Sequence, residues 1–420
     1  MGAERDGGGD GGVQCDGNVD TPANAAVVAL LRKQLAAGEH HGVAVAAFLN
    51  GVPIVHAWAG PGVHARTLFM AASVAKGCTA AALAVLHSQG LLDYTARVSS
   101  VWPEFSRNGK GDVTLEQALS HRAGLYASMP RPGIALRLLC RHYLRGWRAM
   151  SDAGCSWLAG LTPDWTPGTW AAYHPVSWSW IVIGICQGCT GRHIRDVFAE
   201  EVAAPLASTT CMHLGVLPQQ ERRRVLPLVR PSAAQLWHSS AGAAVGTLMR
   251  VVRFLSAWLE ALVMVTIFNA NVFSAVCLPS SNGFWTAIAV ARLYGALANG
   301  GRVQLPDSTS SVELLDPAKL AALHHKVRTD ARVASPEGET AQNSLGFSPW
   351  PHLCAGADTD SLVLGHGGMG GSVAWADVDR GLSVCVLRSS YSPISLGACA
   401  ATRELAECIR AHAPRVGGAS

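Results

Sequence analysis

The chain has 420 residues, of which 49% are hydrophobic and only 15% are charged, and its formal net charge is +4. This apolar content is typical of a folded protein and excludes an intrinsically disordered chain. The lysines and arginines are scattered, with no basic run longer than Arg222–Arg224, so the charge pattern argues against a nucleic-acid-binding surface.

The first residues, 1–21, are rich in glycine and aspartate, which predicts a disordered tail. No apolar segment typical of a secretion signal follows Met1. The 12 cysteines are spread along the chain and do not form a disulfide framework, so we expect a reducing, cytoplasmic location. Cys186 and Cys189 form a single C-x-x-C pair, which we interpret as structural packing.

The next segments alternate between helix and strand. Residues 23–37 predict a helix, and residues 43–49 and 52–58 predict two strands. Asn50-Gly51 lies between these strands and is the strongest short-range signal for a β-hairpin. An alanine-rich helix is then expected over residues 72–86.

The middle of the chain, residues 134–278, predicts helical segments broken by glycine and proline. The uncharged stretch 261–291 is interrupted by asparagine, proline and glycine. Its continuous apolar part, 261–268, is far shorter than the ~20 residues that a membrane span requires. We therefore expect a buried helix here and no stable membrane insertion.

Towards the end of the chain, residues 286–298 predict a helix, 372–377 and 382–387 predict strands, and 396–411 predict a terminal helix. Strands thus lie near both ends and helices lie between them. This arrangement predicts an α/β fold of the α+β type, with an antiparallel sheet flanked by helices. We expect one α/β domain built from residues 22–100 and 285–420, with a mainly helical subdomain, residues 101–284, inserted into it.

Ser73 and Lys76 form an S-x-x-K pair at the start of the alanine-rich helix. Positions i and i+3 of a helix lie on one face, and a serine at the first turn meets the positive end of the helix dipole. A desolvated, uncharged lysine amine can act as the base for such a hydroxyl. The alternative is a helix-start serine followed by a surface lysine.

Two further motifs accompany this pair. Tyr173 follows a Pro-Gly turn and precedes a helix, a position from which a phenol can face a cleft, although a core tyrosine is the alternative. The glycine-rich run 365–372 precedes a strand, where glycines allow the backbone to approach a ligand closely. Free N–H groups there could bind a developing oxyanion, and an ordinary glycine-rich turn is the alternative.

The order of these three motifs resembles the serine β-lactamase and penicillin-binding superfamily, above all class C β-lactamases and the esterases related to them. The resemblance extends over residues 40 to 390 and implies a β-lactamase/penicillin-binding-like fold. Four additional similar stretches are Gly90–Asp93, Val113–Leu125, Thr190–Arg192 and Pro279–Gly283.

The resemblance implies the roles of the site residues. Ser73 would be the acylated nucleophile, Lys76 would accept its proton, and Tyr173 would share the base role and protonate the leaving group. The backbone N–H groups of Ser73 and Met369 would form the oxyanion hole. His366, Gly367, Gly368 and Asn282 would contact the substrate.

Departures from the β-lactamase pattern restrict the substrate. His366 stands where β-lactamases have the lysine of K-T-G, so the cation that grips a substrate carboxylate is lost or becomes pH-dependent. Gly367 replaces the threonine, and Pro175 replaces the asparagine of the Tyr-x-Asn pattern. These changes favour the esterase branch, with at most weak β-lactamase activity.

The function that follows is a serine hydrolase that cleaves ester or amide bonds of small molecules through an acyl-enzyme. This mechanism needs no metal or organic cofactor, so none is expected. The adjacent histidines at 40–41 and 324–325 do not share a helix face, which argues against a metal site there. Two alternatives remain open. One is a catalytically inactive binding or assembly protein on the same fold, and the other is a peptidase, amidase or acyltransferase that uses the same residues.

Overall fold

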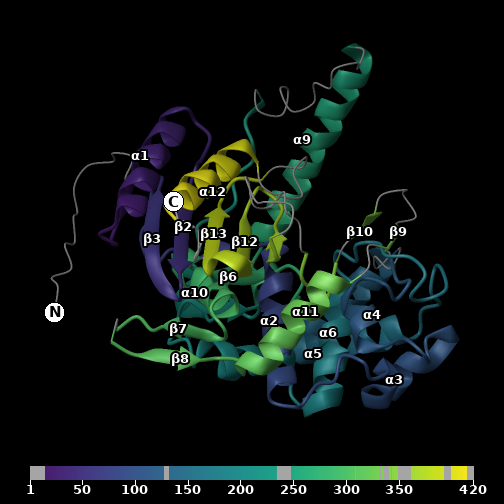
Figure 1. Ribbon diagram of the computed structural model, residues 1–420. Helices are drawn as coiled ribbons and strands as arrows, with labels where there is room; N and C mark the ends of the chain where they lie inside the picture. The colour runs from purple at the N-terminus through teal and green to yellow at the C-terminus, as the bar shows by residue number, and fades with distance from the viewer. Residues whose placement is uncertain are drawn as a thin grey trace.

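A six-stranded antiparallel sheet forms the centre of the α/β part of the molecule (Figure 1). The computed structural model describes residues 15–126, 132–233, 247–307, 309–330, 333–334, 340–341, 343–348, 361–391 and 399–413. The strands in spatial order are β1 (Cys15–Gly17), β3 (Val52–Ala59), β2 (Val43–Leu49), β13 (Leu382–Arg388), β12 (Val373–Asp377) and β11 (Val363–Gly367). β2 pairs with β13, so strands from the two ends of the chain lie side by side in one sheet.

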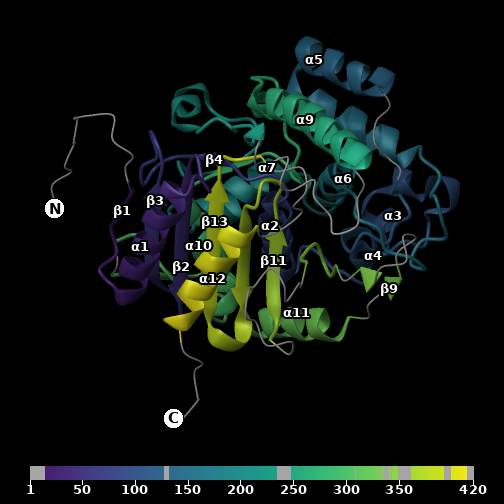
Figure 2. The ribbon, with the colours of Figure 1, turned by 90° about the horizontal axis from the view of Figure 1, so that it is seen from above.

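Helices cover both faces of this sheet. α1 (Pro22–Ala36) and α12 (Ala400–Ala411) pack on one face, and α2 (Val74–Ser88) and α10 (Ala287–Ala298) pack on the other (Figure 2). Almost all of α2 is buried, and its many alanines allow it to pack closely against its neighbours. The structure therefore confirms the predicted class, an antiparallel sheet between layers of helices.

Smaller sheets and hairpins surround this core. A three-stranded sheet joins β4 (Phe69–Met70), β6 (Gly283–Trp285) and β5 (Met212–Leu214). Two hairpins pair β7 (Arg302–Gln304) with β8 (Ser311–Glu313) and β9 (Val333–Ala334) with β10 (Thr340–Ala341). β5 lies in the segment for which only helices were predicted, because three residues are too few to show an alternating pattern.

Most of the helical segments between the chain ends lie beside the β11 edge of the sheet (Figure 2). Thr114 and Gln117 form a capping box at the start of α4 (Leu115–Leu119), with hydrogen bonds of 3.2 and 3.1 Å. The remaining helices are α3 (Val98–Val101), α4 (Leu115–Leu119), α5 (Pro132–Ala159), α6 (Trp178–Thr190), α7 (Ile194–Val197), α9 (Thr247–Asn269) and α11 (Pro317–Thr329). Short 3-10 or π turns are η1 (Pro103–Gly109), η2 (Phe198–Ala203), η3 (Gln219–Arg224), η4 (Phe273–Ala275) and η6 (Val378–Arg380).

The prediction of a disordered tail over residues 1–21 is wrong for its last part. Cys15 pairs with Ala59 at the edge of the sheet, and the Thr21 side chain accepts a hydrogen bond from the Asn24 N–H at the start of α1. The short strand β1 is therefore stabilised by its pairing with β3, which the composition of residues 1–21 does not reveal. Residues 1–14 lie outside the described part of the chain.

The prediction of a buried helix over residues 261–268 is also wrong. The helix found there, α9, is much longer and largely exposed. The segment Val251–Ala275 is long and apolar enough to cross a membrane by length and composition alone, and only 22% of its most apolar window is buried. The predicted apolar segment begins after Glu260, but the helix begins earlier in the chain and includes Glu260, Arg250 and Arg253.

Candidate active site

Ser73 is the residue at which strand β4 turns into helix α2. Its side chain makes no capping hydrogen bond to the helix and is partly exposed, so its Oγ is available to other groups. The preceding residue, Ala72, has a φ of +46°, a left-handed conformation that disfavours residues other than glycine. The Ala71 N–H bonds to the Gly283 carbonyl at 2.9 Å and holds this strained turn against β6.

Lys76 lies one helical turn after Ser73 and is completely buried. Its Nζ lies 3.4 Å from Ser73 Oγ, 2.9 Å from the Pro175 carbonyl and 3.1 Å from the Ser280 carbonyl. Burial lowers the pKa of the Lys76 amine well below its ordinary value of 10.5. A neutral amine beside the Ser73 hydroxyl can accept its proton.

Tyr173, in the segment that precedes α6, contacts the same Ser73 hydroxyl. Its OH donates to Ser73 Oγ at 2.8 Å, and Lys76 Nζ lies 4.6 Å from the centre of its ring. Burial raises the pKa of the Tyr173 phenol above its ordinary value, and the hydrogen bond to Ser73 opposes part of that rise. The phenol is therefore protonated at neutral pH and can donate a proton, while the amine can accept one.

Two buried histidines hold the segment that carries Tyr173. His121 accepts hydrogen bonds from the Ala172 N–H through its carbonyl and from the His174 N–H through Nδ1, at 3.2 and 3.1 Å. His174 donates from Nδ1 to the Ala172 carbonyl and accepts from the Leu125 N–H at Nε2, which fixes its neutral form. Burial lowers the pKa of His174 to about 4.

The His121 ring also lies 5.0 Å from the Tyr173 ring, centre to centre. Neither histidine was predicted from the sequence to have a role, although His121 lies in one of the stretches that carry the family resemblance. The contact with Tyr173 is invisible in the sequence because 52 residues separate the two side chains.

The expected oxyanion hole combines the first turn of α2 with the end of β11. Gly368 lies so close to the nucleophile turn that a Cβ there would be 2.7 Å from the Ala71 carbonyl oxygen. Within the described part of the chain, neither the Ser73 N–H nor the Met369 N–H donates a hydrogen bond. That these two N–H groups bind a developing oxyanion stays a prediction.

His366 is buried on β11, and its ring lies 5.9 Å from the Tyr173 ring. Its Nδ1 donates to the Gly367 carbonyl at 2.6 Å, and its buried Nε2 has no partner among the described residues. Burial and the nearby Lys76 lower the pKa of His366 to about 3. The imidazole is therefore neutral at physiological pH and does not replace the cation of the β-lactamases.

Asn282, expected to contact the substrate, is completely buried. Its Nδ2 donates to the Phe273 and Val276 carbonyls at 2.9 and 2.7 Å, and its Oδ1 accepts from the Leu278 N–H at 2.8 Å. These bonds close the loop whose Ser280 carbonyl accepts a hydrogen bond from Lys76. The side chain positions a partner of Lys76 and has no donor left for a substrate.

The described residues contain no group of three or more histidines, cysteines or acids that could hold a metal ion. The eleven described cysteines, Cys186 and Cys189 among them, are all free thiols. Of the tryptophans close to Tyr173 in the sequence, Trp178 and Trp180 are buried in the core, whereas Trp170 is 45% exposed.

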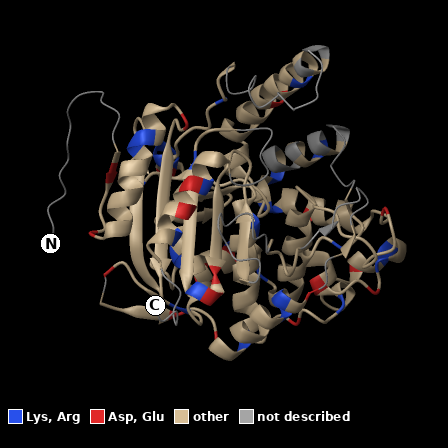
Figure 3. Ribbon diagram, turned by 45° about the horizontal axis from the view of Figure 1, so that its top comes forward, with Lys and Arg blue, Asp and Glu red and all other residues tan. Residues whose placement is uncertain are grey.

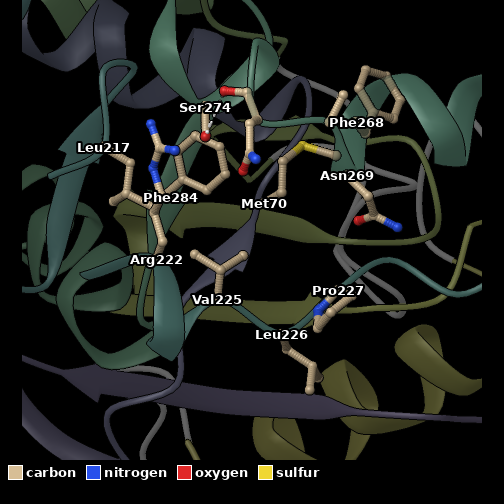
Figure 4. A pocket seen from close by; sticks show the side chains of 12 residues that line it. Met70, Leu217, Arg222, Val225, Leu226, Pro227, Phe268, Asn269, Ser274 and Phe284 are labelled. Atoms are coloured by element: carbon tan, nitrogen blue, oxygen red, sulfur yellow. Dashed lines mark hydrogen bonds between the residues drawn. The ribbon is translucent and has the colours of Figure 1, made fainter. Parts of the chain in front are cut away.

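A separate cavity of about 150 Å³ lies near the start of the nucleophile turn (Figure 4). Met70 lines it from β4, and Phe268 and Asn269 at the end of α9 face Leu217 and Arg222 across it. Ser73, Lys76 and Tyr173 do not line this cavity. It is therefore distinct from the space above Ser73 Oγ.

The chain is similar to proteins of one known family. The profile of the Beta-lactamase family matches residues 27–406. The chain is 28% identical over 386 residues to the esterase/beta-lactamase LipL of Mycobacterium tuberculosis, covering 88% of this chain and 81% of that protein.

Two solved structures are similar along almost the whole chain. A family VIII carboxylesterase has 25% identity and a TM-score of 0.76, over 95% of this chain and 99% of that one. A penicillin-binding protein homolog from Caulobacter crescentus has 28% identity and a TM-score of 0.71, with the same coverage.

Proposed function

The chain belongs to the beta-lactamase family and is a serine hydrolase, and we propose that it cleaves esters of small, uncharged molecules through an acyl-enzyme on Ser73. One observation carries this proposal: Ser73 Oγ lies 2.8 Å from a protonated phenol and 3.4 Å from a buried amine of lowered pKa. This arrangement can remove the serine proton and supply a proton to a leaving group.

In the first step the Ser73 hydroxyl proton passes to Lys76 Nζ while Oγ forms a bond to the ester carbonyl carbon. The carbonyl π electrons move to the oxygen, which the Ser73 and Met369 N–H groups stabilise; one such donor is worth ~3–4 kcal/mol of barrier. The new ammonium is stabilised by the Pro175 and Ser280 carbonyls and by the Tyr173 ring.

Collapse of this intermediate breaks the bond to the leaving alcohol. The Tyr173 hydroxyl gives its proton to the departing oxygen, and the phenolate recovers a proton from Lys76. The acyl group remains on Ser73. In the second step water attacks the acyl carbon, Tyr173 passes its proton to Lys76 and takes one from the water, and Lys76 returns its proton to Ser73 Oγ as the acyl bond breaks. This releases the acid and restores the serine, the amine and the phenol.

The electrostatics of the cleft support an uncharged ester as substrate. His366 is neutral, so no permanent cation is present at the position where β-lactamases hold a carboxylate. Relatives of this chain are named as an esterase/beta-lactamase and a carboxylesterase, which agrees with this preference. We therefore propose at most weak activity on carboxylate-bearing β-lactams.

The test is hydrolysis of p-nitrophenyl acetate by the wild-type protein, Ser73→Ala and the control Ser100→Ala, whose Oγ bonds only locally to the Arg97 carbonyl. We expect hydrolysis by the wild type and the control and none by Ser73→Ala. Intact-mass analysis with a slowly deacylated ester should show one adduct that maps to the peptide containing Ser73. Equal rates for all three proteins, or no adduct, would contradict the proposal, and the absence of both hydrolysis and adduct would favour a non-catalytic protein on this fold.

A further inference from the structure

α9 carries a continuous apolar surface that the catalytic proposal does not use. In Figure 1 the helix rises away from the body of the molecule. Between Met249 and Ile267 the exposed apolar stripe extends over ~27 Å at 1.5 Å per residue. Its members, each at least 45% exposed, are Met249, Val252, Leu255, Trp258, Leu259, Val263 and Ile267.

The opposite side of α9 fixes the helix to the protein. Ala257, Ala261 and Val265 are buried against the body. At the end of the helix the Asn269 side chain exchanges two hydrogen bonds of 2.9 Å with the backbone of Leu228. The helix is thus attached along its inner side and cannot enter a bilayer lengthwise without breaking this packing, but it can lie flat on a surface.

The charges of α9 agree with a lipid surface. Its only charged residues are Arg250, Arg253 and Glu260, and the Glu260 carboxylate accepts a hydrogen bond of 2.8 Å from the Tyr391 hydroxyl. Figure 3 shows how sparse charge is along the described part of this helix. Trp258 shares a surface hollow with Arg230. Tryptophan and arginine beside an apolar face match the interface of a bilayer with anionic headgroups.

The shape of the stripe distinguishes a bilayer from a protein groove. At 100° per residue, its side chains cover about half of the helix circumference. A helix that binds in a protein groove presents a narrower line of anchors at i, i+3, i+4 and i+7. A broad, convex apolar face on a projecting helix fits the plane of acyl chains better.

The same helix contacts the elements of the active site. Ala261 and Val265 belong to one apolar cluster with Met70 and Ala72, which precede Ser73, and Met369 packs against this cluster. The surface that carries the stripe is therefore joined through a single layer of side chains to the turn that presents the nucleophile and to the expected oxyanion loop.

We propose that the exposed face of α9 binds the surface of lipid membranes, with the helix in the plane of the interface, and that Ser73 acts there on esters of lipophilic acyl groups. The second half of this proposal rests on the proposed esterase function. The first half does not, because adsorption requires no catalysis.

The binding test is flotation of the full-length protein with vesicles of phosphatidylcholine, alone or with phosphatidylglycerol. A variant combining Val252→Ser, Leu255→Ser and Leu259→Ser removes the centre of the stripe. The matched control combines Val52→Ser and Leu91→Ser, which remove two apolar side chains of similar exposure, 48% each, far from α9. Circular dichroism and p-nitrophenyl acetate hydrolysis verify that both variants fold.

We expect the wild type, the control and Ser73→Ala to float with vesicles, more strongly when phosphatidylglycerol is present, and the stripe variant to lose about tenfold or more in partitioning. Hydrolysis of a long-chain ester dispersed in vesicles should fall in the stripe variant, while that of soluble p-nitrophenyl acetate is unchanged.

Absence of flotation by the wild type, or equal flotation of the stripe variant, would overturn the proposal. So would a wild type that sediments as an oligomer while the stripe variant is a monomer and neither floats, because the face would then join two copies. Flotation without hydrolysis of either ester would instead refute the proposed function and leave the membrane surface standing.

Discussion

Replacing Tyr173 by phenylalanine separates proton transfer from every other role of this side chain. The substitution removes only the hydroxyl that donates to Ser73 Oγ at 2.8 Å. It keeps the ring that lies 4.6 Å from Lys76 Nζ and 5.0 Å from the His121 ring. Ser73 Oγ retains its contact with Lys76 at 3.4 Å, so the nucleophile and its base stay in place.

The expected loss is that of a general acid. Removal of such a group costs typically 10²–10⁴-fold in rate, which corresponds to about 3–5 kcal/mol of barrier at ~1.4 kcal/mol per tenfold. Stability should change far less, because one intramolecular hydrogen bond contributes only ~1 kcal/mol net. A large effect on kcat/KM together with a small effect on unfolding is the signature of a chemical role.

The assay compares kcat/KM for p-nitrophenyl acetate and for an alkyl ester of the same acid. The alkyl ester has a poor leaving group and should lose more activity, because it needs the proton from Tyr173 more. Tyr94→Phe is the control: its hydroxyl is buried without a hydrogen-bond partner among the described residues. A loss below about tenfold for both esters, or equal losses in Tyr173→Phe and Tyr94→Phe, would refute the assigned role.

Three other substitutions test the surroundings of the nucleophile. Burial lowers the pKa of Lys76 below its value in the unfolded chain, so the native state binds fewer protons between the two pKa values and this group makes stability rise with pH there. Lys76→Met should be inactive, and urea titrations at several pH values should show that its stability lacks this contribution. An unchanged dependence of stability on pH would mean that the amine stays charged. Gly368→Ala places a Cβ 2.7 Å from the Ala71 carbonyl and should lower kcat about tenfold or more, whereas Gly111→Ala, with only one atom at 4.0 Å, should not. Asn282→Ala removes the partners of the Phe273 carbonyl and the Leu278 N–H, whereas the Val276 carbonyl keeps its bond from the Val216 N–H. It should lower the free energy of unfolding by about 2–4 kcal/mol, measured as a shift of the urea midpoint. A raised KM at unchanged stability would return Asn282 to substrate binding.

The parts of the molecule that the sequence predicted well depend on local chemistry. Asn50 and Gly51 both adopt positive φ, at 49° and 76°, as the two-residue hairpin between β2 and β3 requires. The i and i+3 positions of Ser73 and Lys76 place both groups on one face of α2 whatever surrounds the helix. Tyr173 was found through the order of motifs, which carries information that no short window contains.

The parts that the sequence missed depend on contacts between distant segments. Asn282 stands in a stretch that resembles a substrate-binding motif, yet its amide is consumed by carbonyls six and nine residues earlier in a loop whose closure no pattern predicts. α9 was misjudged for a different reason. Its inner side is apolar because it packs on the protein, and its outer side is also apolar, so composition alone could not separate burial from exposure.

The electrostatics of the cleft connect the substrate preference to the base. Lys76 and His366 each lie in a buried site, and the nearness of Lys76 contributes to the lowered pKa of His366. A permanent cation at position 366 would repel the proton that Lys76 must take from Ser73 and would lower the pKa of this amine further, unless a substrate carboxylate compensated for it. A neutral imidazole removes that repulsion when the substrate is an uncharged ester. His366→Lys should therefore reduce ester turnover at neutral pH and increase the relative binding of substrates that carry a carboxylate. Both changes can be checked by measuring kcat and KM for a matched pair of esters, one with and one without a carboxylate. An unchanged preference between the two esters would show that this position does not set the charge of the substrate.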